Sequence, residues 1–212
     1  MTHQETPENG MHDALTCQAD YFNALAREGI WESFLPEETE KIQKFIRLWD
    51  IQSGATLFEP GCGAGRLTQE LAATVGEDGR VVACDIAPEM VKRARNRRYS
   101  AAVSVHCCSL TEVPCTPHSF DRIICFNVFP HFHDREHILR SLKEMLAPGG
   151  RLWICHNRGR EAINRIHAEG GEQIRGHQLP LVNDLEALLA KAGFHVLDSC
   201  DTPDEYWVTA HA

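Results

Sequence analysis

Three glycines fall within five positions of the stretch "LFEPGCGAGRL", residues 57 to 67, directly after an apolar run and directly before a helical pattern. Glycine permits positive backbone φ angles and lets a ligand lie against bare backbone. In parallel α/β sheets, ligands bind at the carboxyl ends of the strands, which is where such a loop would stand. We therefore predict a ligand-binding loop made of Gly61, Cys62, Gly63 and Gly65.

Glu59, just before this loop, indicates which ligand the loop accepts. A dinucleotide-binding loop places its third glycine three positions after the second, but that position is Arg66 here, and the third glycine comes earlier. A carboxylate repels a phosphate and attracts an ammonium group. The pattern favours a cationic, phosphate-free nucleoside over a nicotinamide dinucleotide. A tight turn that binds nothing is the alternative interpretation.

Asp85 ends the next apolar run, "RVVACD", and lies 20 residues after Gly65. A carboxylate at this place in a doubly wound sheet can accept hydrogen bonds from both ribose hydroxyls. Each hydrogen bond to a charged acceptor contributes about 1.5–3 kcal/mol. The alternative role for Asp85 is to cap the helix that begins at Pro88. Because of the loop before it, we predict the ribose role.

Polar side chains also follow the later apolar runs and could receive the second substrate. Asn127 ends "FDRIICFN" and is expected to face the cofactor, and His131 and His133 follow it in the same loop. A histidine near its unperturbed pKa suits general acid–base chemistry. The alternative is that the histidines of this loop are exposed at the surface while the neighbouring phenylalanines pack inside.

A further polar set begins where the run "GRLWICH" ends. If the chain is helical from Arg160, then His156, Arg160, Asn164 and His167 recur every three to four residues and share one face. A solvent-facing helix explains this spacing equally well. His131, His156 and His167 could also hold a metal ion with an open coordination position. We predict acid–base or substrate-orienting roles for His131, His156, His167 and Arg160, and no metal.

The elements that must position these residues follow from the hydrophobic pattern. Short β-rich runs alternate with helical stretches after Gly54, which predicts a parallel sheet with helices on both faces. The tail "HVLDSC", "DTPDE", "YWVTAHA" predicts a closing antiparallel hairpin. The expected fold is a Rossmann-like, doubly wound α/β sheet of mostly parallel strands, preceded by N-terminal helices. We expect residues 1–16 to be a frayed tail and residues 17–212 to form one domain.

Composition limits the compartment and the partners. The formal net charge of −9 argues against nucleic acid as a partner, and no apolar run is long enough to span a membrane. The nine cysteines include no CxxC pair, and several lie in apolar β-like runs, where cysteine behaves as a buried hydrophobe. We therefore expect a reducing, cytoplasmic compartment and a monomer or homodimer.

Four stretches together resemble a known family: "EPGCGAG", "VVACDIAPEMVKRAR", "SFDRIICFNVF" and "LRSLKEMLAPGGRLWI". In order and spacing they resemble the class I S-adenosylmethionine-dependent methyltransferases, and most of all the small-molecule group called methyltransferase type 11. The resemblance runs from about Gly54 to Cys155. It implies a seven-stranded sheet whose last hairpin inserts one antiparallel strand, in agreement with the pattern of the tail.

The resemblance also implies roles for individual residues. Glu59 would serve the methionine end of S-adenosylmethionine, Asp85 the ribose hydroxyls, and Ile86 would pack on adenine. The family usually offers an acid to the adenine amino group, but Ser109 stands at that place in "SLTEVP". A neutral hydroxyl accepts a weaker hydrogen bond than a carboxylate does, and the backbone amide of Leu110 could contribute.

The sequence thus predicts a methyltransferase that uses S-adenosylmethionine and acts on a small molecule. Two alternatives remain at this point: a non-catalytic regulator that binds the same cofactor, and a nicotinamide-dependent oxidoreductase. The residues do not identify the methyl acceptor.

Overall fold

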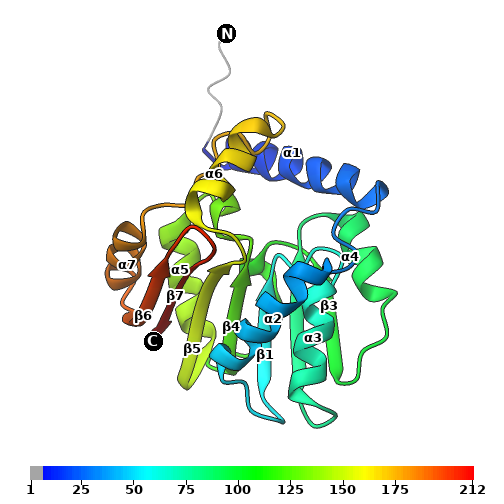
Figure 1. Ribbon diagram of the computed structural model, residues 1–212, viewed down its shortest axis with the longest axis vertical. Coiled ribbons are helices and arrows are strands. Elements are labelled where there is room, and N and C mark those ends of the chain that lie inside the picture. Colours follow the sequence, from blue (N-terminus) through cyan, green and yellow to red (C-terminus); the bar gives the residue numbers. More distant parts are fainter. Residues whose placement is uncertain (1–6) are drawn as a thin grey trace.

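A seven-stranded sheet forms the centre of the protein (Figure 1). The computed structural model describes the backbone of residues 7–212 and the side chains of residues 14–212. The strands are β1 (Thr56–Pro60), β2 (Arg80–Asp85), β3 (Ala102–Cys107), β4 (Phe120–Phe126), β5 (Leu146–His156), β6 (His195–Asp201) and β7 (Tyr206–His211). The helices are α1 (Pro7–Arg27), α2 (Pro36–Trp49), α3 (Arg66–Val75), α4 (Pro88–Arg95), α5 (Arg135–Met145), α6 (Arg160–Glu169) and α7 (Val182–Lys191), with short 3₁₀ turns at Leu110–Glu112 and Phe129–His131.

The strand order β3-β2-β1-β4-β5-β7-β6 confirms the predicted fold class. Strands β1 to β5 pair in parallel, whereas β7 pairs antiparallel with both β5 and β6. The order reverses between β1 and β4, so the connections that leave these two strands run to opposite sides. Such a switch point opens a crevice at the carboxyl ends of the strands, and this crevice is where ligands bind in doubly wound sheets.

Alternation along the strands divides the interior into two cores. On β1, Leu57 faces a core closed by α2 and α3, while Phe58 faces a core closed by α5 and α7. On β4, Ile124 and Cys125 divide in the same way. Because both faces of the sheet are covered, the strands carry nearly continuous apolar runs, and this is the pattern that made them recognisable in the sequence.

Helix α1 corrects the expected N-terminal tail. The prediction of a frayed segment over residues 1–16 is wrong for residues 7–16, which are helical, and residues 1–6 lie outside the described part of the chain. The later turns of α1 dock on α4: Ala26 packs with Met90, and Asn23 accepts a hydrogen bond from the backbone N–H of Glu89. The helix continues outward from this docked part to Pro7, a residue that fits a first helical turn.

The cysteines follow the expectation with one exception. Cys84, Cys125 and Cys155 are buried in the sheet, but Cys107 is exposed. Cys107 ends β3, which is an edge strand and therefore has a neighbour on one side alone.

Over the part of the chain that the structure describes, no helix is long and apolar enough to cross a membrane.

Candidate active site

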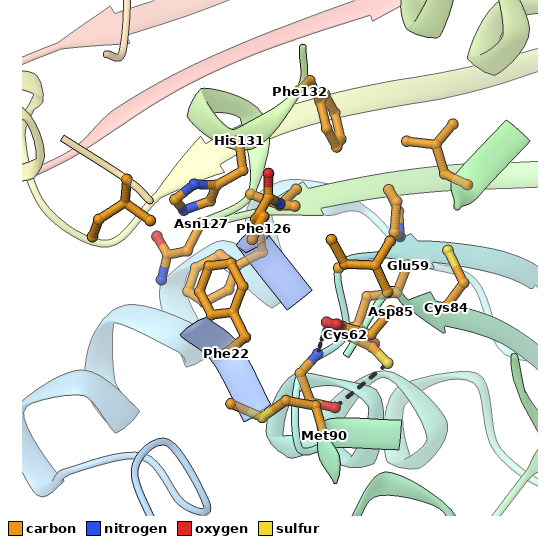
Figure 2. A pocket seen from close by; sticks show the side chains of 18 of the residues that line it. Phe22, Glu59, Cys62, Cys84, Asp85, Met90, Phe126, Asn127, His131 and Phe132 are labelled. Atoms are coloured by element: carbon orange, nitrogen blue, oxygen red, sulfur yellow. Dashed lines mark hydrogen bonds between the residues drawn. The ribbon is translucent and has the colours of Figure 1, made fainter. Parts of the chain in front are cut away.

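A cavity of about 420 Å³ opens at the carboxyl ends of β1, β2, β4 and β5. Helices α1 and α6 lie across this end of the sheet (Figure 1). Figure 2 shows Glu59, Cys62 and Asp85 gathered at one end of the cavity, and Asn127 and His131 at the other. The predicted site residues that line it are Glu59, Gly61, Cys62, Gly63, Asp85, Ile86, Ser109, Leu110, Asn127, His131, His156 and His167.

The glycine loop lies close to the neighbouring strand and loop. The backbone N–H groups of Gly61 and Cys62 both donate to the carbonyl of Cys84, at 2.8 and 2.9 Å. Gly61 has φ +71°, and a Cβ there would lie 2.3 Å from a methyl carbon of Val128. Gly63 has φ +53°, and a Cβ there would meet nothing nearer than the Met90 sulfur at 4.0 Å. Gly61 therefore allows the loop to pack closely against Val128. Gly63 leaves open space on the side of the loop that faces the cavity.

Gly65 does not line the cavity, so its predicted ligand contact is corrected. Its φ is +78°, and a Cβ would lie 2.7 Å from the Tyr99 hydroxyl and 3.0 Å from the Cβ of Ala94. This glycine therefore lets the start of α3 pack against α4. It supports the loop without facing the ligand.

Glu59 is a buried carboxylate, 3% exposed, at the floor of the loop. Its Oε2 accepts a hydrogen bond of 2.6 Å from the Thr68 hydroxyl. Burial raises the pKa of Glu59 to about 8; the Thr68 hydrogen bond lowers it, the Asp85 carboxylate raises it, and Arg66 and Arg97 lower it. A carboxyl with such a pKa becomes ionised when a cation binds beside it.

Asp85 organises the loop as well as facing the cavity. Its two carboxylate oxygens accept from the backbone N–H groups of Gly63 and Ala87, at 2.8 and 2.9 Å. Burial raises the pKa of Asp85, and the hydrogen bonds from Ala87, Gly63 and Ile86 lower it. The bond to Ala87 closes the turn before α4, but α4 has no side-chain cap, so the helix-capping alternative is not borne out. The same carboxylate lies in the cavity wall.

Asn127 belongs to a polar network that the sequence did not reveal. Its backbone has φ +54°, and its amide bonds to that of Asn157 at 3.2 Å. Asn157 donates in turn to Glu38 of α2 at 2.8 Å, and Glu38 pairs with Arg66 at 3.2 Å. The network joins the ends of β4 and β5 to α2 and α3 at the cavity wall. Asn157 adjoins His156 and so could have been suspected, whereas Glu38 is 119 residues away.

The buried imidazoles of His131, His156 and His167 line the other end of the cavity, and His177 lies behind His131. The rings of His131 and His167 have centroids 4.9 Å apart, and the Nδ1 of His131 lies 2.8 Å from the Nδ1 of His177. The edge of Phe22, from α1, packs against His131 with centroids 5.2 Å apart. Burial and the neighbouring imidazoles lower the pKa of His131 well below its ordinary value. Burial also lowers the pKa of His167.

His156 is more deeply buried than the sequence suggested. It is 1% exposed, and neither ring nitrogen has a hydrogen-bond partner in the protein. Burial, with His167 nearby, lowers its pKa to about 3. A buried polar ring without a partner is costly unless a ligand or water satisfies it. His156 therefore presents two unused nitrogen atoms at the cavity floor.

Two members of the predicted helical face point elsewhere. The guanidinium of Arg160 pairs with Asp201 at 3.4 Å and is absent from the cavity wall, so its catalytic assignment is corrected. Asn164 bonds to both backbone groups of Leu179, at 2.7 and 3.0 Å.

Within residues 14–212, no group of three His, Cys, Asp or Glu side chains could hold a metal ion. The metal alternative for the three histidines therefore has no support.

Comparison with known proteins agrees with this geometry. The family described as "Methyltransferase domain" matches residues 58–154. The ubiquinone biosynthesis O-methyltransferase of Xanthomonas euvesicatoria pv. vesicatoria is 29% identical over 209 residues, covering 90% of this chain and 85% of that protein. The protein of the same name from Xylella fastidiosa strain 9a5c is also 29% identical over 209 residues, covering 90% of this chain and 82% of its own.

Solved structures share the fold. A SAM-dependent methyltransferase from Aquifex aeolicus superposes with a TM-score of 0.67 at 22% identity, covering 84% of this chain and 98% of that one. Phosphoethanolamine N-methyltransferase 2 from Haemonchus contortus, in complex with S-adenosylmethionine, gives a TM-score of 0.59 at 19% identity, covering 75% of this chain and 38% of that one.

Residues 58–154 match a methyltransferase domain, and the comparisons support a methyltransferase that uses S-adenosylmethionine as its cofactor. The fold, the enzyme class and the cofactor predicted from the sequence are thereby confirmed. The oxidoreductase and regulator alternatives find no support in these comparisons.

Proposed function

We propose that this methyltransferase modifies a hydroxyl group of a small aromatic molecule. The observation that carries the proposal is the convergence of His131, His156 and His167 at the end of the cavity away from the glycine loop. Burial lowers the pKa of each of these imidazoles, so they are neutral near pH 7 and can accept a proton. The relatives named as O-methyltransferases support the same reaction class.

The shape and polarity of the cavity support a flat, largely apolar acceptor. Aromatic and branched side chains from α1, β4, α6 and the segments that follow β4 and α6 surround the three imidazoles. Planar rings bind well between aromatic and aliphatic side chains, which add edge and face contacts to the burial of apolar area. The apolar side chains at this end are Tyr21, Phe22, Phe126, Phe132, Ile163, Ile166 and Ile174.

The residues at the glycine loop fit a cationic, phosphate-free nucleoside. Glu59 and Asp85 present two acidic groups and the loop presents bare backbone. We assign Glu59 and the loop to the methionine end, Asp85 to the ribose hydroxyls, Ile86 to adenine, and Ser109 and Leu110 to the adenine edge. We also assign Asn127, which lines the same cavity, to the cofactor. When bound, the cofactor supplies an electrophilic methyl group on a positively charged sulfur.

The chain's own contribution to the reaction is alignment, exclusion of water and removal of one proton. The sulfur leaves as a neutral thioether, so the leaving group needs no acid. A hydroxyl acceptor, however, must lose its proton to become a strong nucleophile. The Nδ1 of His167 contacts the carbonyl oxygen of His177, which can only accept, so His167 carries its proton on Nδ1 and its Nε2 is a free acceptor. Such a nitrogen can hold an acceptor hydroxyl in place.

The compartment and partners form part of the proposal. All nine cysteines are free thiols, which supports a reducing, cytoplasmic location. The net charge of −9 supports a small-molecule acceptor over nucleic acid. We expect the protein to act as a monomer or a homodimer.

A transfer assay tests this function. Purified protein is incubated with methyl-labelled S-adenosylmethionine and, separately, with catechol, 3,4-dihydroxybenzoate, aniline or thiophenol, and the products are identified by mass spectrometry. We expect label on the hydroxyl oxygen of a dihydroxybenzene together with S-adenosylhomocysteine. Transfer to the amine or thiol probe alone, or to none of the hydroxyl probes, would overturn the proposal. The Gly63→Val variant, expected not to bind the cofactor, gives the background rate.

A further inference from the structure

His131 and His177 form a direct imidazole pair at the outer wall of the cavity, at the end away from the glycine loop. We call this end, which contains His131, His156 and His167, the acceptor end, and the end with Glu59 and Asp85 the cofactor end. His131 lies in the 3₁₀ turn after β4 and is 9% exposed, whereas His177 lies between α6 and α7 and is half-buried behind the cavity wall. Their Nδ1 atoms are 2.8 Å apart, a hydrogen-bond distance. Two neutral imidazoles make this bond only if one carries its proton on Nδ1 and the other on Nε2. The tautomers of the two rings are therefore opposite and coupled.

We propose that His177 acts through His131: it holds His131 as the base of the methyl transfer and conducts the released proton from the closed cavity to solvent. The inference deepens the proposed function and rests on it. His177 is a positioning residue, since it contacts His131 and lies outside the cavity wall. It was not among the site residues predicted from the sequence.

In this proposal, each transfer moves one proton from the acceptor hydroxyl through His131 and His177 to water. In the resting pair, His131 donates its Nδ1–H to the Nδ1 of His177, so the Nε2 of His131 has a free lone pair and the proton of His177 sits on Nε2. The acceptor O–H gives its proton to the Nε2 of His131, while its oxygen bonds to the methyl carbon and the sulfur keeps the electron pair of the broken S–C bond. The Nδ1 proton of His131 moves to His177, and the Nε2 proton of His177 leaves to water. The products are a methyl ether, S-adenosylhomocysteine and one released proton.

The other two buried imidazoles that line the cavity, those of His156 and His167, lack such a route. The Nδ1–H of His167 donates to the backbone carbonyl of His177, and a carbonyl cannot pass a proton on. Both nitrogens of His156 are buried without a protein partner. Among the three buried imidazoles that line the cavity, His131 alone has a second titratable ring behind it that reaches toward solvent, and the other two lining histidines, His133 and His137, are exposed. This is the geometric reason for assigning the base to His131.

Several contacts hold His131 and His177 in place relative to each other. The backbone N–H of His177 donates to Ile174 at 2.9 Å and closes a turn. Arg135 of α5 donates to the carbonyl of the adjacent Gln178 at 2.7 Å. Together with the His167 contact, these bonds hold the segment between α6 and α7 against the cavity wall. The Phe22 edge holds the His131 ring from the other side.

The charged and titratable groups around His131 and His177 disfavour a second proton on either ring. They are His167 from α6, His156 from β5, His133 from the loop after β4, and Arg135 from α5. Burial lowers the pKa of His177 to about 4, and His133, His167 and Arg135 lower it as well. No carboxylate is among the groups that set the pKa of His131 or His177. A second proton on either ring is therefore unfavourable, which favours its transfer to solvent.

The first test reads the tautomers and needs no acceptor. Nitrogen-15 NMR of histidine-labelled protein at pH 7 distinguishes a protonated from an unprotonated ring nitrogen. We expect His131 to carry its proton on Nδ1 and His177 on Nε2, with a coupling across the hydrogen bond between them. The opposite assignment, with the proton of His131 on Nε2, would overturn the proposal whatever the activity assay gives.

The second test separates positioning from proton release. His177→Ala removes both, and we expect a fall in kcat of about 10²-fold with catechol, within the usual range for acid–base catalysis. His177→Gln keeps an oxygen that can accept from His131 but cannot relay a proton, and we expect a smaller fall, about 10-fold. Exogenous imidazole should restore part of the activity of His177→Ala. The exposed His195 on β6 provides the control: His195→Gln should match the wild type.

The nature of the acceptor decides between this role and a purely structural one. The hydroxyl of 4-nitrocatechol is far more acidic than that of catechol, so it arrives largely ionised and needs no relay. His177→Ala should therefore lose little activity with 4-nitrocatechol and much with catechol. Equal losses with both probes, or no loss with catechol, would overturn the relay. If wild-type protein methylates neither probe, the proposed function fails instead, and the NMR assignment still judges the histidine pair.

Discussion

The two ends of the cavity are built in different ways. At the cofactor end, the loop and its two carboxylates come from one stretch of the chain, residues 59–85, on adjacent parallel strands. At the acceptor end, His131, His156, His167 and His177 come from four separate segments, and Phe22 comes from a helix over 100 residues earlier. A site made by neighbouring strand ends is visible as a motif, whereas a site assembled from distant segments depends on how those segments pack.

The two ends also differ in their electrostatics. Glu59 and Asp85 are acidic groups whose pKa burial raises, whereas the imidazoles are basic groups whose pKa burial lowers. Both sets are therefore shifted toward their neutral forms in the unliganded protein. A cation would ionise the acids at one end, and an acceptor hydroxyl would protonate an imidazole at the other. The charge at each end therefore depends on a different substrate: the cofactor for the acids and the methyl acceptor for the imidazoles.

The largest expected effect tests the cofactor end alone. Gly63→Val places a branched side chain on a residue with φ +53°, on the open side of the loop. We expect S-adenosylmethionine binding to fall below detection by calorimetry, because the side chain occupies the ligand's space. Gly149→Val carries similar backbone strain, with φ +77° and open surroundings at the far end of the sheet. If Gly149→Val loses binding to the same extent while folded, the loss comes from strain and not from the cavity.

The next effect tests the acceptor end alone. His156→Gln should reduce kcat by about 10²-fold or more while the cofactor Kd stays within about threefold of wild type, the pattern of lost acceptor positioning. The glutamine keeps polar atoms in the space of a residue that is 1% exposed. His167→Ala should behave in the same way. A parallel loss of cofactor affinity in either variant would show that the two ends are not separable.

Asp85 should give an intermediate effect at the cofactor end. Asp85→Ala removes the acceptor of the Gly63 and Ala87 N–H bonds as well as the proposed ribose contact, so we expect the cofactor Kd to rise about 10-fold or more. Asp198→Ala, on the exposed face of β6, is the matched control. Unchanged binding by a folded Asp85→Ala protein would place the ribose elsewhere.

A pH effect tests the electrostatic side of the comparison. With a pKa of about 8, Glu59 is mostly protonated at pH 7 in the free protein. A bound cation favours the carboxylate and lowers this pKa, so binding should release a proton below pH 8, and affinity should rise between about pH 6 and 8. Calorimetry at pH 7 in buffers of different ionisation enthalpy measures the release. Glu59→Gln should abolish it, and a release that persists in this variant would assign it to another group.

The smallest effect concerns Arg160, which the structure removes from the site. Arg160→Ala should leave kcat and the cofactor Kd within about twofold of wild type. Its loss breaks the pair with Asp201 between two partly exposed side chains, so unfolding free energy should fall by no more than about 1 kcal/mol. Thermal melts and the transfer assay measure both. A large loss of activity would return Arg160 to the acceptor end.

The fold class, and the residues that we propose for the cofactor end, could be predicted from local patterns in the sequence. The alternation of buried strands with helices predicted the order of elements, because a strand covered on both faces must be apolar throughout. Glu59, the glycine loop and Asp85 were identifiable because adjacent parallel strands bring their carboxyl ends to one edge, so sequence spacing reports position. The same reasoning failed for Gly65, since a glycine required by α3–α4 packing has the same pattern as one required by a ligand.

The residues that we propose for the acceptor end could not all be predicted from the sequence. Helical spacing placed Arg160 with His156 and His167, but Arg160, at the start of α6, pairs with Asp201, whereas His167, two turns later, packs against His131. The partners that complete the site, Glu38 in α2, Phe22 in α1 and His177 before α7, lie far from the motif in the chain. Their positions follow from packing between elements, and packing depends on the shapes of whole surfaces that no local spacing encodes.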